Sequence, residues 1–145
     1  MTMRAFVCLA GVAAVTACAT PSQPLPPGEV TTNVSARLGN EFDLAVGQTA
    51  RIAGTPVTLL FRSVAEDSRC PVDVQCVWAG NGRTILSLSA SGVGTSEVSL
   101  NTTTDPRITT YAGYRIRLAG LKPPTRAGVT IPPASYVATF EVAAP

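Results

Sequence analysis

The chain has 145 residues, a formal charge of +2 and no histidine, and hydrophobic residues make up 46% of it. The small net charge provides no field that would draw nucleic acid or another strongly charged partner. The absence of histidine removes the commonest general base, the Ser/His and Cys/His nucleophile pairs and the commonest zinc ligand, so few catalytic mechanisms remain open to the chain.

The first residues have the layout of an export signal. Arg4 precedes an apolar run, 5–17, which ends in small residues and is too short to span a bilayer. The run closes with the sequence VTAC, which resembles the lipobox of bacterial lipoproteins, where the cysteine is lipidated and becomes the first mature residue. The alternative is an ordinary secretory signal in which Cys18 has no role. We predict a signal peptide at 1–17 and a lipid anchor on Cys18.

The resemblance to lipoproteins also implies a location. The residue after the cysteine is Ala19 rather than an Asp, and in lipoproteins of cells with two membranes this implies sorting to the outer membrane. Several acyl chains, at about 0.8 kcal/mol for each buried methylene, would anchor the protein stably without a transmembrane helix. The expected location is therefore outside the cytoplasm, in the outer membrane facing the periplasm or the cell surface, and the membrane is a partner through the anchor alone.

The segment 18–40 is predicted to be an extended tether, since it holds four prolines and little that could build a core. Two of the four cysteines are used before the domain begins, because Cys8 leaves with the signal peptide and Cys18 takes the lipid. An exported compartment oxidises thiols, so Cys70 and Cys76 are predicted to form a disulfide. Their spacing is unlike the CxxC of thioredoxin-type redox sites.

From residue 41 to the end of the chain, apolar and polar residues alternate with period two, which indicates half-buried strands. The pattern predicts strands at 41–46, 57–64, 114–118 and 135–142, and shorter ones at 49–52, 75–79, 84–89 and 95–100. The sequence GNGR at 80–83 predicts a tight hairpin, because Asn81 and Gly82 tolerate positive φ. We expect a single all-β domain at 41–145, an antiparallel β-sandwich of immunoglobulin-like topology or a small barrel, with about seven to nine short strands.

Three carboxylates, Glu66, Asp67 and Asp73, lie close together around the first cysteine of the pair. One interpretation is a calcium-dependent protein or a carboxylate-based enzyme centred on these acids. The interpretation we favour is ion pairing with Arg62 and Arg69, or caps on loop amides, because the spacing matches no EF-hand. No metal, cofactor or catalytic residue is therefore predicted.

Trp78 follows the second cysteine by two residues, so a regular strand would place both side chains on one face. Packing of this tryptophan against the disulfide in the core is the favoured interpretation. The alternative is a surface aromatic that stacks on a sugar or a partner. Tyr114, Arg115 and Arg117 form a second candidate contact surface, since aromatic and arginine residues are enriched in binding hot spots. Such arginines also commonly cover the outer face of a sheet.

The stretch VAEDSRCPVDVQCVWAGNGRTILSL, with LAVGQTARI before it and YAGYRIRLAGLKPP and SYVATFEV after it, resembles a group of uncharacterised small secreted bacterial proteins and lipoproteins that share a DSRCP and WAG segment. The similarity covers nearly the whole predicted domain. It implies a recurrent module of the cell envelope and implies no catalytic residue.

These observations favour a non-enzymatic binding or structural module of the envelope, whose partner is a protein, a peptide or a glycan. The predicted binding surface comprises Glu66, Asp67, Arg69, Asp73, Trp78, Tyr114, Arg115 and Arg117. A sandwich that inhibits proteases by inserting loops from one end into a cleft is a further alternative, supported by analogy of fold alone.

Overall fold

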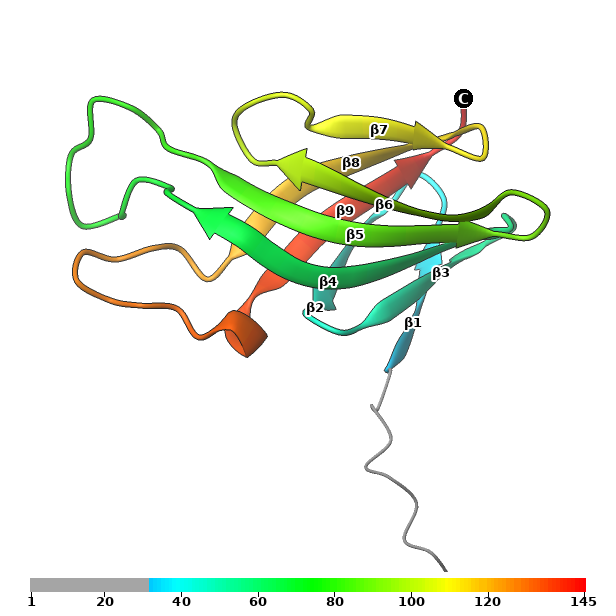
Figure 1. Cartoon of the computed structure of the whole chain (residues 1–145), viewed down its shortest axis with the longest axis horizontal. Helices are drawn as coiled ribbons and strands as arrows, with labels where there is room; N and C mark the ends of the chain where they lie inside the picture. Colours follow the sequence, from blue (N-terminus) through cyan, green and yellow to red (C-terminus); the bar gives the residue numbers. More distant parts are fainter. Residues whose placement is uncertain (1–31) are drawn as a thin grey trace, which may run out of the picture.

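The computed structural model describes residues 32–145, so the predicted signal peptide, Cys18 and most of the predicted tether lie outside the described residues. These residues form nine strands in two sheets that pack face to face (Figure 1). The predicted all-β sandwich is confirmed, and the sheets do not close into a barrel. Within 32–145, no helix has the length and apolar character needed to cross a membrane.

The first sheet has the order β1-β3-β4-β5-β6 and the second the order β2-β9-β8-β7. Neighbouring strands are antiparallel except for β1 and β3, which are parallel. Four consecutive strands, β3 to β6, share one sheet as a meander, and this order differs from the immunoglobulin arrangement, where successive strands exchange sheets more often. The strands are β1 (Asn33–Arg37), β2 (Glu41–Ala45), β3 (Thr49–Ala53), β4 (Val57–Asp67), β5 (Gly82–Ala90), β6 (Gly94–Asn101), β7 (Ile108–Tyr111), β8 (Tyr114–Lys122) and β9 (Val137–Ala143), and a 3-10 turn at Pro133–Ser135 precedes β9.

The core lies between the sheets and follows the predicted alternation. Every second residue of β9 from Ala138 to Val142 is fully buried, as is every second residue of β4 from Leu59 to Phe61. Phe61 of the first sheet meets Phe140 of the second edge to face, with ring centroids 5.7 Å apart. Each such buried Leu, Val or Phe contributes about 2 kcal/mol to folding through the hydrophobic effect.

The domain begins earlier than predicted, because β1 lies inside the predicted tether. The four prolines that suggested a tether all precede residue 28, and the chain after them can pair with a neighbour. Val34 and Ala36 alternate with polar residues, and Ala36 is buried against the core. A second unpredicted strand, β7, is four residues long and rich in threonine, so its alternation was too short to detect.

The predicted strand at 75–79 and the GNGR hairpin were both wrong. Residues 68–81 form a long loop between β4 and β5, and β5 pairs with β4 from its first residue, Gly82. Gly80 has a φ of 68°, whereas Asn81 does not adopt positive φ. The alternation at 75–79 arises in a loop that the disulfide closes, so its apolar side chains need not face a core.

Candidate functional site

Two long loops extend from the same end of the sandwich: residues 68–81 join β4 to β5, and residues 123–136 join β8 to β9 (Figure 1). We call the first the stapled loop and the second the proline loop. Two register shifts in β4, after Phe61 and after Val64, change its course on the way to the stapled loop. Most residues predicted to be functional lie at this end.

The stapled loop is fixed at its base and closed by a disulfide. The predicted bridge between Cys70 and Cys76 is present, with Cα atoms 6.0 Å apart. Two backbone hydrogen bonds extend the β4–β5 pairing into the loop, from Ser68 N to the Asn81 carbonyl (2.7 Å) and from Cys70 N to the Ala79 carbonyl (2.8 Å). The loop is therefore held in one shape at its base and at its middle.

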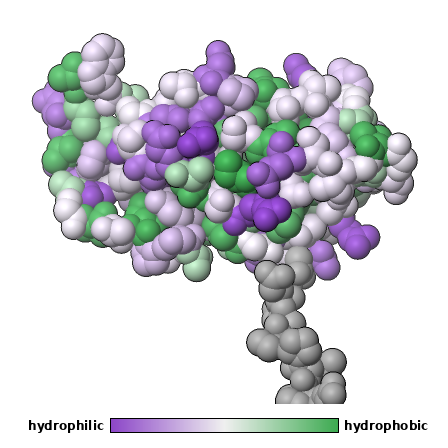
Figure 2. Space-filling view, viewed as in Figure 1, coloured by the Kyte–Doolittle hydropathy of each residue, from purple (hydrophilic) through white to green (hydrophobic). Residues whose placement is uncertain are grey.

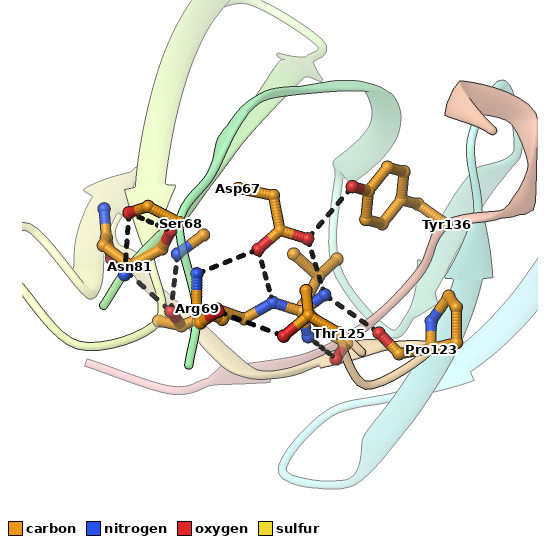
Figure 3. Close-up of polar contacts among 10 residues, drawn as sticks. Asp67, Ser68, Arg69, Asn81, Pro123, Thr125 and Tyr136 are labelled. Carbon is orange, nitrogen blue, oxygen red and sulfur yellow. Dashed lines mark hydrogen bonds and ion pairs between the residues drawn. The ribbon is translucent and has the colours of Figure 1, made fainter. Parts of the chain in front are cut away.

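A buried ion pair lies where the two loops leave the sheets (Figure 3). Arg69 donates to both carboxylate oxygens of Asp67, each over 2.7 Å, and the side chains are only 14% and 8% exposed. The guanidinium also donates to the carbonyls of Leu121 (2.5 Å) and Pro123 (2.9 Å), and Tyr136 donates its hydroxyl to Asp67 over 3.0 Å. This Asp67–Arg69–Tyr136 cluster joins β4, the end of β8 and the start of β9.

The ionisation of the cluster is that of a structural ion pair. Burial alone raises the pKa of Asp67, but hydrogen bonds from Arg69 and Tyr136 outweigh it, and the pKa of Asp67 lies below its ordinary value of 3.8. Burial and the hydrogen bond to this carboxylate raise the pKa of Tyr136 above 10.0. At neutral pH the carboxylate is ionised and the phenol is protonated, so neither is poised for proton transfer.

The two loops are also tied to each other near their tips. Val72 N donates to the Thr125 carbonyl over 3.0 Å, and Ala127 N donates to Oδ1 of Asp73 over 2.9 Å. The Thr125 hydroxyl donates to the Arg69 carbonyl over 3.0 Å (Figure 3). The predicted capping of loop amides by an acid is thus confirmed for Asp73.

The three predicted acids do not converge on one point. Glu66 faces Arg83 across the β4–β5 pair at 3.6 Å, Asp67 is saturated by Arg69 and Tyr136, and Asp73 caps Ala127. Across residues 32–145, no three His, Cys, Asp or Glu side chains are grouped so that they could hold a metal ion. The alternative of a calcium or carboxylate site centred on these acids is therefore not supported by their positions.

Trp78 is 82% exposed, so its predicted packing in the core was wrong. The reason is that Cys76 and Trp78 lie in a loop rather than on a core strand. Four other large apolar side chains at this end are exposed: Val72 (61%), Val74 (47%), Val77 (90%) and, in the proline loop, Val129 (61%). We call these five residues the loop-end surface, and Figure 2 shows hydrophobic groups, in green, among the polar ones at this end.

The predicted surface around Tyr114, Arg115 and Arg117 lies elsewhere. β8 starts at Tyr114, at the end of the sandwich opposite the two loops (Figure 1). Arg117 bonds to Glu141 over 2.7 Å and to Glu41 over 2.9 Å, and these hydrogen bonds, led by the one to Glu141, raise the pKa of Arg117. This arginine covers the outer face of the second sheet, as the structural interpretation predicted.

Tyr136, Thr125 and Asn81 are central to the loop end but were not predicted. Asn81 Nδ2 donates to Oδ1 of Asn101 over 2.9 Å, and Asn81 Oδ1 accepts from Thr103 N over 3.2 Å. All three residues act across long separations in the chain. The one signal in the sequence was the placement of a tyrosine at the start of β9, where its ring is core and its hydroxyl can reach a polar group.

No family model matches the chain, and no curated protein or solved structure is significantly similar to it. The structure itself shows a disulfide in a β domain.

Proposed function

We propose that the protein is an exported, lipid-anchored module of the cell envelope that binds a partner without catalysing a reaction, and that the loop-end surface makes the contact. The observation that carries the proposal is Trp78, which is 82% exposed on a segment fixed by a disulfide and by paired backbone hydrogen bonds. The sequence features at 1–18 support export and anchoring.

The physical argument concerns the cost of leaving these side chains in water. Burying a tryptophan removes roughly 150–250 Å² of surface from solvent, so its exposure forgoes a large stabilisation. Large exposed apolar residues gathered at one end of a domain commonly mark a binding site, and tryptophan is enriched among the residues that dominate binding energy. Because the loops are already held rigid, little conformational entropy remains to be lost when a partner binds.

A role without catalysis is supported by the state of the polar groups. The two carboxylates at this end already accept hydrogen bonds within the protein: Asp67 from Arg69 and Tyr136, and Asp73 from Ala127 N. The protease-inhibitor alternative has less support, because Val74 N donates to the Pro71 carbonyl (3.3 Å) and closes a turn, whereas proteases bind extended segments.

Two valines provide a matched test of the surface. Val77 is 90% exposed in the stapled loop, and Val93 is 59% exposed in the β5–β6 turn at the opposite end. We expect purified protein carrying Val77→Ala to recover fewer cross-linked envelope components than wild type, and Val93→Ala to match wild type. Identical sets from all three proteins would contradict the proposed surface.

Anchoring is tested separately by growth with a labelled fatty acid. Wild-type protein should incorporate the label, and Cys18→Ala should not. Equal labelling of the two proteins, or none in wild type, would remove the lipid anchor from the proposal while leaving the binding surface to its own test.

A further inference from the structure

A shallow pocket of about 380 Å³ lies beside Trp78, where the stapled loop meets the connection between β6 and β7. No charged side chain lines it. Its lining consists of one aromatic residue, three hydroxyl residues, one amide and two small residues: Trp78, Ser68, Thr103, Thr104, Asn81, Ala79 and Gly80.

We propose that this Trp78 pocket binds one or two rings of an uncharged saccharide. The inference rests on the proposed function, since it assigns a ligand class to part of the same end of the molecule. A sugar ring carries an apolar face of C–H groups and a rim of hydroxyls. A flat indole beside fixed hydroxyls is complementary to both, because the π face accepts the C–H groups and the hydroxyls take the rim.

Two of the three hydroxyl groups that line the pocket are oriented by internal hydrogen bonds. Ser68 Oγ donates to the Asn81 carbonyl over 3.1 Å, and Thr103 Oγ1 donates to the Gly80 carbonyl over 2.5 Å. Ser68 Oγ also accepts a hydrogen bond from Asn81 N over 3.2 Å, which leaves one further lone pair on this oxygen, whereas a hydroxyl that only donates keeps two. Ser68, Thr103 and Thr104 are exposed, so these oxygens can accept hydrogen bonds from sugar hydroxyls.

The floor of the pocket is rigid before any ligand binds. Asn81 uses its amide to hold Asn101 and Thr103, and Gly82 exchanges two hydrogen bonds with Thr102, from Gly82 N to Oγ1 (2.8 Å) and from Thr102 N to the Gly82 carbonyl (3.0 Å). Asn81 is a positioning residue in this scheme. A preformed site loses little entropy on binding, which suits a ligand as weakly held as a short oligosaccharide.

The lining favours a saccharide over a protein side chain or a charged ligand. Val72, Val74 and Val77 do not line the pocket, so Trp78 is its one large apolar side chain. A charged ligand would find no counter-charge among the lining side chains and would lose hydration without a paired group in return.

Trp78 is the chain's only tryptophan, so its fluorescence reports on the pocket directly. The full-length protein is titrated with two uncharged oligosaccharides, cellotetraose and tetra-N-acetylchitotetraose, and with the anionic tetragalacturonate. We expect a saturable change in emission with at least one uncharged sugar and a weaker one with the anionic sugar.

Calorimetry then compares variants with the sugar that binds. Trp78→Ala should weaken binding about tenfold or more, as expected for loss of a central aromatic contact, and Thr104→Ala about threefold. Val93→Ala, in the β5–β6 turn at the opposite end of the sandwich, should bind the sugar as wild type does. Both altered pocket residues are exposed, so an unchanged melting temperature verifies the fold of each variant.

Two results would overturn the assignment: no saturable signal with either uncharged sugar, or unchanged affinity in Trp78→Ala. If either occurs while Val77→Ala still loses cross-linked components, the proposed function stands and the assignment of a saccharide to the Trp78 pocket is wrong. If the sugar binds as described while Val77→Ala and Val93→Ala behave alike, the pocket stands and the wider loop-end surface does not.

Discussion

The hydroxyl of Tyr136 donates a hydrogen bond to Oδ2 of Asp67 over 3.0 Å, although the two residues lie 69 positions apart in the chain. This bond joins the residue just before β9 of one sheet to the end of β4 in the other. It therefore closes the sandwich at the end from which both long loops extend.

Removing this hydroxyl should weaken the fold. Tyr136→Phe keeps the buried ring and leaves an ionised carboxylate short of one donor, so we expect the free energy of unfolding to fall by about 1–2 kcal/mol. Urea denaturation measures the change. Tyr114→Phe, at a half-buried tyrosine outside the cluster, should have a much smaller effect, and equal losses in the two variants would contradict the role given to Tyr136.

The cluster also predicts how stability depends on pH. The pKa of Asp67 is lower in the folded protein than its ordinary value of 3.8, so the folded state releases this proton more readily than the unfolded chain. The resulting stabilisation is complete above about that ordinary value and declines as pH falls below it.

Melting temperatures across the acidic range test the pH prediction. The fall in stability below the ordinary aspartate pKa should be shallower in Asp67→Asn than in wild type. Asp43 is a useful comparison, since hydrogen bonds from Lys122 and Thr139 lower its pKa too, but its side chain is 48% exposed and screened by solvent. Asp43→Asn should therefore flatten the profile less, and the opposite ranking would be inconsistent with our account.

Replacing Gly80, at the base of the stapled loop, with any residue that has a Cβ is predicted to lower the free energy of unfolding. Gly80 has a φ of +68°, and a Cβ added there would come within 1.8 Å of the Ser68 carbonyl oxygen. Gly92 has a φ of +79° with nothing within 4 Å of a Cβ. Gly92→Ala should cost about 1–2 kcal/mol for its backbone conformation, and Gly80→Ala should cost a further 1–3 kcal/mol, roughly, for the clash. Chemical denaturation of both variants separates these contributions, and equal costs would show that the loop base can shift.

Reducing the disulfide should loosen the stapled loop more than the sandwich. The chain-entropy model gives a stabilisation of about 2–3 kcal/mol for closing so short a loop. Two hydrogen bonds to the proline loop do not depend on the bridge, one from Val72 N to the Thr125 carbonyl and one from Ala127 N to Asp73. They should keep part of the stapled loop in place. We expect the β-sheet circular dichroism of Cys70→Ser/Cys76→Ser to match wild type while proteolysis within 70–76 becomes faster. Loss of the sheet signal would mean that the bridge is needed for the whole fold.

The strands that build the core could be predicted because one face of each is buried, which imposes period two on residues such as Leu59, Phe61 and Phe140. The disulfide was predicted from the expected export of the chain, because oxidising compartments convert paired thiols to disulfides. The prediction for Trp78 was wrong because the same alternation of apolar and polar residues occurs by chance at 75–79. This segment is a loop that pairs with no neighbouring strand, so the alternation buries no side chain there.

The partners of Asp67 were only partly predictable. Arg69 is two residues away, and its pairing is local. Tyr136 meets the carboxylate because the two sheets pack together at this end, and the pairing of Asn81 with Asn101 likewise depends on β5 lying beside β6. Contacts of this kind are set by topology, which a single sequence does not encode in any short pattern.

The parallel pairing of β1 with β3 has a mechanical consequence. β1 begins at Asn33, so any force that reaches the domain from the preceding chain enters through this strand. Its five residues are in register with Thr49 to Ala53. A pull along the strand axis loads the hydrogen bonds of that pairing together in shear, which resists rupture better than opening them one at a time.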